Sequence, residues 1–381
     1  MSAGLGLWLA LASLAAWLYL FFLHGRFWIS QPELLPANPA QCPDIDIVVP
    51  ARDECETIGA AIGSLLAQDY RGEFRITLVD DQSTDGTAAA AGTARNLTVL
   101  DGAPKPDGWS GKLWALAQGI AATRAPILLL TDADIVHDPA HLSTLAARLE
   151  RSRALLVSEI VRLNCESRAE RLLVPAFVYF FQMLYPFAKV NDPASRVAAA
   201  SGGTVLIRRE ALAAMGGIEA IRGALIDDVS LARAVKRFGP IYLGHSGLAR
   251  SIRPYPHFAD IWRMVSRTAF TQLRGSVLWL VATIAAMCLV WLVPVWQILF
   301  GRGWGFVAGL AAYSLAALSY LPTLQRYRRS AWQVFALPLI ALFYLGATID
   351  SALNAWFGRG ALWKRRTYGA GVSARGLRGV K

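Results

Sequence analysis

The feature that most constrains this chain is a set of four long apolar runs without a charged side chain. They lie at residues 5–23, 277–300, 304–322 and 331–349. As a helix, a run of about 20 residues can cross a hydrocarbon layer of about 30 Å. Charged residues make up 17% of the chain and hydrophobic residues 55%, whereas average soluble domains carry about 25% charged residues. The sequence therefore predicts a membrane protein and excludes intrinsic disorder.

The first run predicts an N-terminal transmembrane anchor within residues 1–30. A cleaved signal peptide is the alternative, and it would have a positively charged start and a cleavage site of small residues. Here the start is uncharged, and the run ends in aromatic residues followed by Arg26. We therefore favour an uncleaved anchor.

The later runs predict two or three transmembrane segments within residues 276–350, followed by a basic tail at residues 351–381. Basic residues favour the cytoplasmic side of a membrane. Arg26 and the basic segment at 325–330 then place the domain after the anchor in the cytoplasm, with the N-terminus outside. A third complete span would carry the basic tail outside. The last run, which contains Pro338, is therefore the candidate for a re-entrant or interfacial segment.

A further apolar run at residues 172–188 lies between the anchor and the C-terminal runs, with Gln182 as its one polar interruption. Its length is at the lower limit for a span. We interpret it as an interfacial helix that lies on the bilayer surface or lines a groove for a lipid acceptor. The alternatives are a buried helix of the domain, or a true span that would divide the domain across the membrane.

Charge and cysteine content narrow the class of protein. Lys and Arg number 38 against 27 Asp and Glu, for a net charge of +11. The chain has no zinc-finger or RNP-like motif, and the late basic clusters flank apolar runs, so we assign the charge to the membrane and predict no nucleic-acid partner. The four cysteines are widely spaced, which fits a reducing compartment. His137 and His141 flank Pro139 and form no zinc motif.

Between the apolar runs, the sequence is typical of an α/β domain. A polar, proline-containing linker is expected at residues 31–43, and the domain at residues 44–275. Strands are predicted at residues 45–49, 74–81, 96–100 and 126–134, and helices at 55–68 and 110–123. This alternation predicts a parallel sheet covered by helices on both faces.

Two acidic residues, Asp132 and Asp134, come directly after an apolar strand. Alternate residues of an extended chain face the same way, and open α/β sheets bind ligands beyond the carboxyl ends of their strands. Two carboxylates at such a place suit Mg²⁺ or Mn²⁺, which would in turn hold a diphosphate. The alternative is an ordinary helix cap, because Pro139 and a helix follow.

A second acidic group, Asp80 and Asp81, follows another predicted strand. Carboxylates here can accept hydrogen bonds from a base N–H or a ribose hydroxyl. Asp85 and Gly86, a few residues later, can instead cap the next helix and form a turn.

Two more groups stand at predicted helix starts. Lys112 lies where helix N–H groups favour phosphate oxygens. Asp227 and Asp228 are adjacent acids before a helix, and neighbouring carboxylates raise each other's pKa. That pKa suits a general base, although a helix cap is the alternative.

The order and spacing of these groups resemble family 2 glycosyltransferases of the GT-A fold. The motifs are VPARDE at 49–54, DDQSTDGT at 80–87, GKLWA at 111–115, DAD at 132–134, SGGT at 201–204 and DD at 227–228. The resemblance covers roughly residues 45–275 and implies a Rossmann-like nucleotide-diphospho-sugar transferase domain. With the apolar runs, the chain looks like the polytopic branch that glycosylates lipids. The stretches PARDE, WSGKLWA and RTAFTQLR look closest to the hopanoid-biosynthesis-associated membrane glycosyltransferases of bacteria.

The resemblance implies a role for each matching donor-side residue. The nucleotide pocket would be lined by Pro50, Ala51, Arg52 and Glu54. Either Asp80 or Asp81 would contact the uracil or its ribose. Lys112 would lie near the nucleotide phosphates, together with Asp132.

The remaining roles concern the metal, the base and the acceptor. Asp132 and Asp134 would hold Mg²⁺ or Mn²⁺, with Asp134 as the more direct ligand. Asp228 would be the catalytic base, with Asp227 in the acidic position before it. The acceptor would be bordered by Ser201, Gly202 and Gly203.

One departure from the pattern concerns the acceptor side. The polytopic branch often carries Q/R-x-x-R-W after the base, whereas the matching region here contains Gln272 and Arg274 with a shorter spacing and no Trp. The expected role of these two residues is to grip phosphate or acceptor. The altered motif argues against a processive polysaccharide synthase.

The sequence therefore predicts an inverting, metal-dependent glycosyltransferase of the bacterial inner membrane, with a cytoplasmic catalytic domain. It would move a sugar from a UDP-sugar to a lipid acceptor, such as a hopanoid-type, other polyisoprenoid or sphingolipid-like lipid. The alternatives are a processive polysaccharide synthase and a non-catalytic lipid-binding membrane protein.

Overall fold

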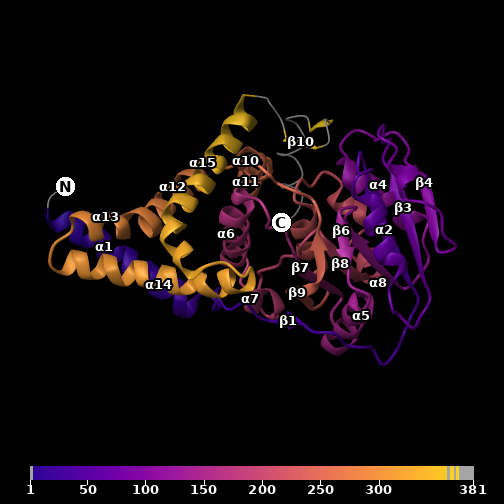
Figure 1. Ribbon diagram of the computed structural model, residues 1–381, viewed down its shortest axis with the longest axis horizontal. Coiled ribbons are helices and arrows are strands. Elements are labelled where there is room, and N and C mark those ends of the chain that lie inside the picture. The colour runs from indigo at the N-terminus through magenta and orange to yellow at the C-terminus, as the bar shows by residue number, and fades with distance from the viewer. Residues whose placement is uncertain (1–2, 358–360, 364–365, 369–381) are drawn as a thin grey trace. The chain divides into compact units, whose positions relative to one another are not determined.

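The computed structural model describes residues 3–357, 361–363 and 366–368. Its main part consists of two compact units (Figure 1). The helical unit comprises residues 3–30, 165–188 and 255–357. The α/β unit comprises residues 31–164 and 189–254. The α/β unit covers most of the domain predicted at residues 44–275, whereas residues 165–188 and 255–275 of that range cluster with the helical unit.

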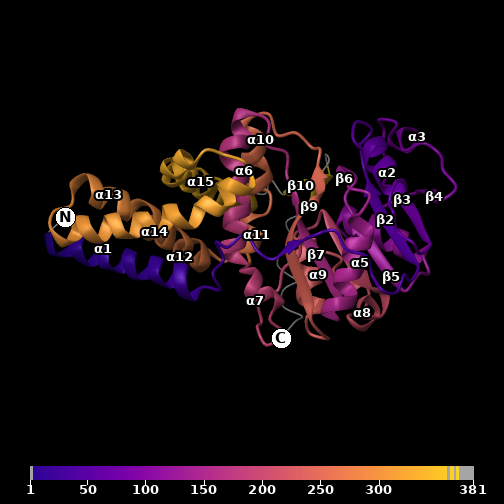
Figure 2. The same ribbon diagram turned by 60° about the horizontal axis from the view of Figure 1, so that its bottom comes forward.

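The α/β unit is built on one sheet, in which nine strands are described, with β1, β9, β7, β8, β5, β2, β3 and β4 in that spatial order and β6 paired to β9. In chain order the strands are β1 (Glu33–Leu34), β2 (Ile45–Ala51), β3 (Phe74–Asp80), β4 (Leu97–Asp101), β5 (Ile127–Thr131), β6 (Ile135–His137), β7 (Leu156–Arg162), β8 (Thr204–Arg208) and β9 (Ile241–Ser251). Figure 2 shows β2, β3, β4 and β5 side by side. A separate sheet pairs β10 (Ala361–Trp363) with β11 (Arg366–Tyr368).

The sheet is mixed, because it contains strands beyond the four that the alternating pattern predicts. Strands β2, β3, β4 and β5 pair in parallel as expected, but β8 runs antiparallel to both β5 and β7, and β6 runs antiparallel to β9. Parallel pairing follows from a helix that crosses over the same sheet between two strands. The segment before β8 instead passes through the helical unit, so no crossover helix on the sheet imposes parallel pairing on β8.

Helices cover both faces of the sheet. They are α2 (Ile58–Leu66), α3 (Thr87–Ala90), α4 (Gly111–Ala121), α5 (His141–Ser152), α8 (Arg209–Ala214) and α9 (Asp227–Val235), with α7 (Phe187–Asn191) at the chain boundary between the units. Strand β2 alternates: Ile47 and Val49 join the core formed with α2 and α5. Val48 faces α4, where a Cβ on Gly119 would lie 2.4 Å from the Val48 side chain. Glycine at 119 therefore lets α4 approach the sheet closely.

The predicted linker at residues 31–43 is partly incorporated into the sheet. Strand β1 pairs in parallel with β9, and the Leu34 side chain is 2% exposed. The carbonyl of Pro32 also accepts a hydrogen bond from the His245 N–H over 2.8 Å. Strand pairing, this backbone hydrogen bond and the buried Leu34 side chain together tie the stretch to the sheet.

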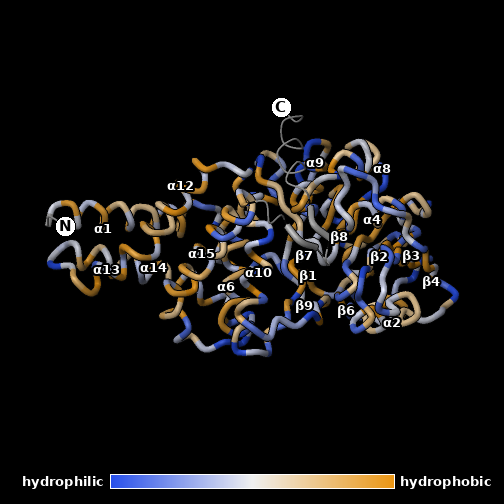
Figure 3. Tube along the Cα trace, turned by 90° about the horizontal axis from the view of Figure 1, so that it is seen from above, coloured by the Kyte–Doolittle hydropathy of each residue, from blue (hydrophilic) through white to orange (hydrophobic). Residues whose placement is uncertain are grey.

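The helical unit contains four helices that are long and apolar enough to cross a membrane. Within the described residues they run over Gly4–Leu23, Val277–Phe300, Trp304–Arg326 and Ala331–Trp356. The corresponding regular helices are α1 (Ala3–Leu18), α12 (Val277–Met287), α13 (Val293–Phe300), α14 (Trp304–Arg326) and α15 (Leu337–Trp356). Hydrophobic colours dominate along α1, α13 and α14, which pack against one another (Figure 3). Three of the four candidate spans are thus C-terminal.

The ambiguous run at residues 172–188 forms most of helix α6 (Arg168–Leu184). Ser167 and Glu170 form a capping box at its start. Its Tyr179 hydroxyl lies 2.7 Å from the Ser319 hydroxyl of α14, and the Leu173 carbonyl accepts a hydrogen bond from Tyr344 of α15 over 2.9 Å. The helix therefore packs within the helical unit rather than in the α/β unit. Its position on the bilayer surface, or along a groove for a lipid acceptor, stays a prediction.

The last candidate span packs along two short helices, α10 (Phe258–Ser266) and α11 (Ala269–Gln272). Asp350 accepts a hydrogen bond from the Trp262 indole over 2.9 Å. Pro338 stands in the first turn of α15, where a missing N–H costs the helix nothing. The basic tail predicted at residues 351–381 begins inside α15, and most of the remainder lies outside the described residues.

Candidate functional site

The carboxyl ends of β2 and β5 open into a pocket of the α/β unit. Six of the predicted site residues line it: Pro50, Lys112, Asp132, Gly202, Asp227 and Asp228. They come from two strand ends, the first turns of α4 and α9, and the turn before β8. Residues up to 178 positions apart in the chain are brought together as the motifs predict.

Lys112 stands at the centre of this pocket. Ser110 caps α4 by accepting a hydrogen bond from the Leu113 N–H over 3.3 Å, which sets the lysine in the first turn. The Lys112 ammonium lies 2.8 Å from Asp132 Oδ1 and 3.0 Å from Asp227 Oδ2. Burial acts to lower the pKa of Lys112, but the charges of Asp132 and Asp227 outweigh it and hold that pKa above its usual value. The lysine therefore stays charged between two carboxylates.

Asp228 sits beside this ion pair at the start of α9. Its Oδ2 accepts a hydrogen bond from the Gly202 N–H over 2.8 Å, and its Oδ1 accepts one from the Val229 N–H over 2.7 Å. Burial and then the neighbouring charge of Asp227 raise the pKa of Asp228 to about 7, against the opposing effects of Lys112 and the two N–H groups. The carboxyl can therefore take up or release a proton near neutral pH.

Glycine at position 202 leaves room for the groups of the pocket. A Cβ there would lie 3.3 Å from the Lys112 ammonium nitrogen and 3.4 Å from Asp228 Oδ2. The lysine would then have to shift by a few tenths of an ångström, whereas Asp228 would be in ordinary contact.

The two acids of the D-A-D motif face different cations. Asp132 pairs with Lys112, whereas Asp134 Oδ2 lies 2.8 Å from Arg253 Nε and accepts a hydrogen bond from the Ser251 hydroxyl over 3.2 Å. Burial raises the pKa of Asp132 to about 6, with Lys112 opposing it. Asp132 is the more exposed, at 33% of its side chain against 11% for Asp134.

Arg253 is a site residue that the sequence analysis missed. Its guanidinium joins Asp134 to Glu54, with Nη2 2.5 Å from Glu54 Oε1. It links the loop after β2 to the D-A-D turn. No motif marks it, because it follows β9 some 119 residues after its partner Asp134.

The expected nucleotide-binding loops after β2 and β3 are tied to each other. Arg52 donates to the backbone carbonyl of Asp81 and lies 3.7 Å from its carboxylate, which is fully buried. Asp80 Oδ1 accepts from the Ser83 N–H over 2.9 Å and is less buried than Asp81. Asp53 Oδ1 accepts from the Thr84 N–H over 3.0 Å. The predicted residues are therefore adjacent, and Asp80 presents the more open carboxylate.

Asp85 and Gly86 lie at the start of α3, as their alternative interpretation expects, and Gly86 rather than Asp85 is the N-cap residue. Asp85 accepts hydrogen bonds from the Thr87 N–H and the Cys55 N–H, each over 3.0 Å. Gly86 has φ +87°, a left-handed conformation that suits glycine. Both residues organise the start of α3 and the loop beside it.

The predicted acceptor residues fall into two groups. Ser201, Gly202 and Gly203 form the turn before β8, beside the pocket. Gln272 and Arg274 belong to the helical unit, where Gln272 donates a hydrogen bond to the Tyr185 hydroxyl and Arg274 has φ +56°. The contact of these two residues with phosphate or acceptor stays a prediction.

Comparisons with known proteins connect part of the chain with glycosyltransferases. Residues 46–216 match the family model for glycosyl transferase family 2. An N-acetylglucosaminyltransferase of Neorhizobium galegae is 43% identical over 60 residues, which are 16% of this chain and 14% of the relative. One of Azorhizobium caulinodans is 32% identical over 126 residues, 31% of this chain and 30% of the relative. The matches thus span less than a third of either relative.

A solved structure resembles the whole fold. The mannosyltransferase of Pyrobaculum calidifontis, determined in complex with GDP-mannose and Mn²⁺, has a TM-score of 0.56 and 19% sequence identity. The likeness covers 92% of this chain and 98% of that one. Together these findings confirm the predicted fold class, a GT-A α/β domain with long apolar helices.

Proposed function

Because residues 46–216 match the family model for glycosyl transferase family 2, we propose that this protein is an inverting glycosyltransferase that moves a sugar from a UDP-sugar to a membrane lipid. The observation that carries the proposal is the pocket, in which Lys112, Asp132 and Asp227 form one ion-paired group directly beside Asp228. A charged lysine at a helix start suits the donor diphosphate, and a carboxyl with a raised pKa suits deprotonation of the acceptor.

The D-A-D acids fit a divalent ion of the kind that accompanies diphosphates. Mg²⁺ is usually held by one or two carboxylates together with substrate phosphates rather than by an all-protein cage. In the part of the chain that the structure describes, no three His, Cys, Asp or Glu side chains gather for a metal, so the two-carboxylate arrangement is the one available. Asp132 and Asp134 would hold Mg²⁺ or Mn²⁺, whose charge would offset that of the leaving diphosphate.

The reaction is a single displacement. Asp228 accepts the proton of the acceptor hydroxyl while the oxygen of that hydroxyl bonds to the anomeric carbon. The bond from that carbon to the diphosphate oxygen breaks, and UDP leaves. Attack from the side opposite the diphosphate inverts the anomeric carbon, through an oxocarbenium-like transition state of the type seen in glycoside chemistry. Lys112, kept charged by its neighbours, offsets the negative charge that develops on the diphosphate.

The helical unit supports a lipid acceptor and a membrane location. Its candidate spans fit a multi-pass protein of the bacterial inner membrane. Arg26 and the basic segment at 325–330 favour an N-terminus outside and a catalytic domain in the cytoplasm, and a basic tail that also stays inside requires the last run to be re-entrant or interfacial. The two N-acetylglucosaminyltransferase relatives make UDP-N-acetylglucosamine the first donor to test. The resemblance to the hopanoid-associated enzymes makes a hopanoid-type hydroxyl the first acceptor.

The test is transfer by membranes that contain the protein. Membranes are incubated with labelled UDP-N-acetylglucosamine, UDP-glucose or GDP-mannose, with Mg²⁺, Mn²⁺ or a chelator, and organic extracts are analysed by mass spectrometry. We expect a metal-dependent labelled lipid carrying one sugar from a UDP donor. Label in a long water-soluble polymer would support the synthase alternative instead, and transfer from GDP-mannose alone would overturn the donor assignment.

A further inference from the structure

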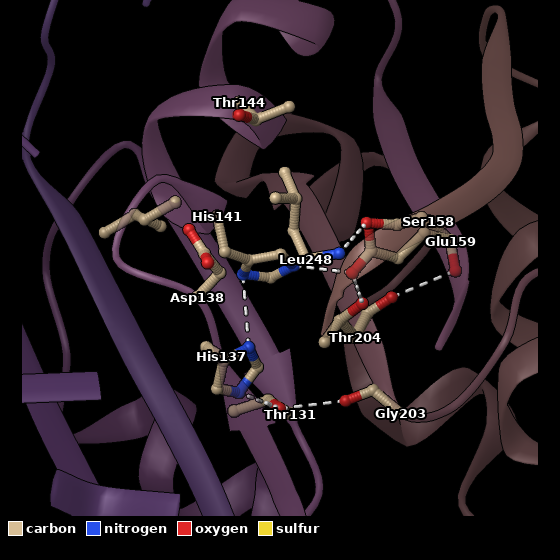
Figure 4. A network of polar contacts seen from close by, with 12 residues as sticks. Thr131, His137, Asp138, His141, Thr144, Ser158, Glu159, Gly203, Thr204 and Leu248 are labelled. Atoms are coloured by element: carbon tan, nitrogen blue, oxygen red, sulfur yellow. Dashed lines mark hydrogen bonds and ion pairs between the residues drawn. The ribbon is translucent and has the colours of Figure 1, made fainter. Parts of the chain in front are cut away.

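A buried polar network lies behind the pocket, in the core of the α/β unit. It runs through Thr131 of β5, His137 of β6, His141 of α5, Glu159 of β7 and Thr204 of β8 (Figure 4). None of these side chains is more than 4% exposed. Buried polar groups are costly unless they are hydrogen-bonded, and the proposed reaction does not use these residues directly. Their arrangement therefore calls for a separate role.

The network ends at the pocket on one side and at a buried acid on the other. Glu159 Oε1 lies 2.6 Å from His141 Nε2 and 3.3 Å from the Thr204 hydroxyl, which donates to it. His141 Nδ1 lies 3.1 Å from His137 Nδ1, and His137 Nε2 lies 3.2 Å from the Thr131 hydroxyl. The Thr131 hydroxyl donates to the Gly203 carbonyl over 2.8 Å.

These contacts fix the direction of hydrogen bonding. Since the single hydroxyl proton of Thr131 goes to Gly203, Thr131 must accept from His137 Nε2. Burial, then the neighbouring His141, lower the pKa of His137, so its ring is neutral and its Nδ1 accepts from His141. The donors therefore point from His141 through His137 and Thr131 to the Gly203 carbonyl, whichever of Glu159 and His141 holds the proton they share.

A second anchor comes from the residue next to Glu159. The Ser158 hydroxyl oxygen accepts a hydrogen bond from the Ser201 N–H over 2.9 Å. Its proton is within reach of the Ser201 carbonyl at 3.1 Å and the Thr204 carbonyl at 3.0 Å. Ser158 thus holds both ends of the turn that contains Gly202 and Gly203.

The turn needs such anchors because glycine has no side chain with which to fix its own conformation. Glycine also has the widest backbone freedom, so residues 202 and 203 restrict the turn least. Yet the Gly202 N–H must reach Asp228 Oδ2, and the Gly203 carbonyl accepts from the Asp132 N–H over 3.2 Å. The geometry of the turn is therefore set by hydrogen bonds from residues outside the turn.

We infer that Ser158, together with the Glu159–His141–His137–Thr131 network, is a positioning device for this turn. It holds the Gly202 N–H against Asp228 and the Gly203 carbonyl against the D-A-D strand end. Of these positioning residues, Thr131 also lines the pocket, and the proposed reaction assigns it no contact with substrate. The inference rests on the proposed function for its catalytic consequence, but the anchoring itself is a property of the free protein.

The first test measures the anchoring without any substrate. Hydrogen–deuterium exchange is followed in the full chain in detergent or nanodiscs, for wild type, Ser158→Ala and a control, Ser143→Ala. Ser143 is 2% exposed and donates to Asp69 Oδ1 over 2.9 Å, so the control loses a comparable buried hydrogen bond away from the turn. We expect peptides covering 201–204 to exchange about tenfold faster in Ser158→Ala only. Equal exchange in the two variants would overturn the inference.

The second test measures the catalytic consequence. In Ser158→Ala we expect kcat to fall about 10- to 100-fold, as for small misplacements of catalytic groups, while Kd for UDP changes less than about twofold. Thr131→Val removes the network's last hydroxyl at constant shape and should lower kcat similarly, with Thr131→Ser restoring most of it. Faster exchange with unchanged kcat would refute the positioning role.

Failure of the proposed function and failure of this inference can be distinguished. If wild-type protein transfers no sugar, the proposed function fails, whereas the exchange comparison still decides whether the turn is anchored. If Ser158→Ala does not fold, the Thr131→Val and Thr131→Ser pair carries both measurements, and identical behaviour of that pair would sink the inference.

Discussion

The two units of this protein bury polar groups in different ways. The pocket of the α/β unit gathers charges, with Lys112 between Asp132 and Asp227, and Asp134 against Arg253. The interior of the helical unit relies mainly on neutral groups, and its buried acid Glu170 accepts hydrogen bonds from backbone N–H groups at the start of α6. Tyr179 meets Ser319 there, and Gln297 Nε2 donates to the Gly6 carbonyl over 2.7 Å.

The difference follows from the cost of burial. A buried charge costs far more free energy than a buried neutral polar group, unless it is paired. Charges are therefore expected where chemistry requires them, and neutral hydrogen bonds where apolar helices only need to be held together. The comparison predicts that changes in the pocket mainly affect activity, while changes in the helical unit mainly affect stability.

The largest expected effect is at Asp228. Asp228→Asn removes the proposed base, so kcat should fall about 10³-fold, while Kd for UDP, measured by calorimetry, changes less than twofold. Asp260→Asn is the control, because Asp260 is also an acid in a first helical turn but belongs to α10 of the helical unit. Normal turnover by purified Asp228→Asn would eliminate the base assignment.

The next effect is at Lys112. Lys112→Met leaves Asp132 and Asp227 without their shared cation, and the two carboxylates then repel the donor phosphates. We expect UDP binding to weaken about tenfold or more, equivalent to about 1.4 kcal/mol. Mn²⁺ binding without nucleotide should become tighter, because no ammonium competes for Asp132. Calorimetry with each ligand separately tests both expectations, and unchanged affinity for both would show that the lysine does not govern this site.

A third prediction concerns pH. Because burial and Asp227 raise the pKa of Asp228 to about 7, the base form is present above that pH and is lost as pH falls through it. The rate kcat/KM should decline about tenfold per pH unit on the acidic side. Asp227→Asn removes a charge that raises the pKa of Asp228, so this limb should move to lower pH. Lys112, which then faces one acid fewer, acts on that pKa in the same direction. A limb that stays in place would contradict the assignment of the limb to Asp228.

The smallest effect is expected in the helical unit. Tyr179→Phe deletes the hydrogen bond to Ser319, whose hydroxyl keeps its own contact with the Ala316 carbonyl at 2.8 Å. We expect the free energy of unfolding to fall by about 0.5–1 kcal/mol, with kcat unchanged. Thermal unfolding in detergent and a transfer assay on the same sample provide the two readings. A large loss of activity would break the division of roles between the units.

The candidate site was predictable from the sequence as far as its acids and Lys112 were concerned. These residues follow short apolar strands or begin helices, and the ends of neighbouring parallel strands meet at one edge of a sheet. Arg253 and Ser158 were not predictable in this way. They act through partners far away in the chain, 119 residues from Arg253 to Asp134 and 43 from Ser158 to Ser201, and no local pattern marks such pairs.

The fold shows the same limit. The strands β2, β3, β4 and β5 follow from alternating apolar and helical segments, and they pair as predicted. The sequence did not show that β8 pairs antiparallel or that α6 belongs to the helical unit. Both depend on where the chain goes between residues 164 and 189.

By itself, the sequence determined that the chain has membrane-spanning candidates and acids at strand ends. Uninterrupted hydrophobicity and strand-to-helix alternation are local properties, and each acts within about one element of structure. Only the tertiary structure decided which cation meets which carboxylate, and which hydroxyl holds the glycine turn. Those contacts join residues that are far apart in the chain, and a displacement of about an angstrom makes or breaks a hydrogen bond.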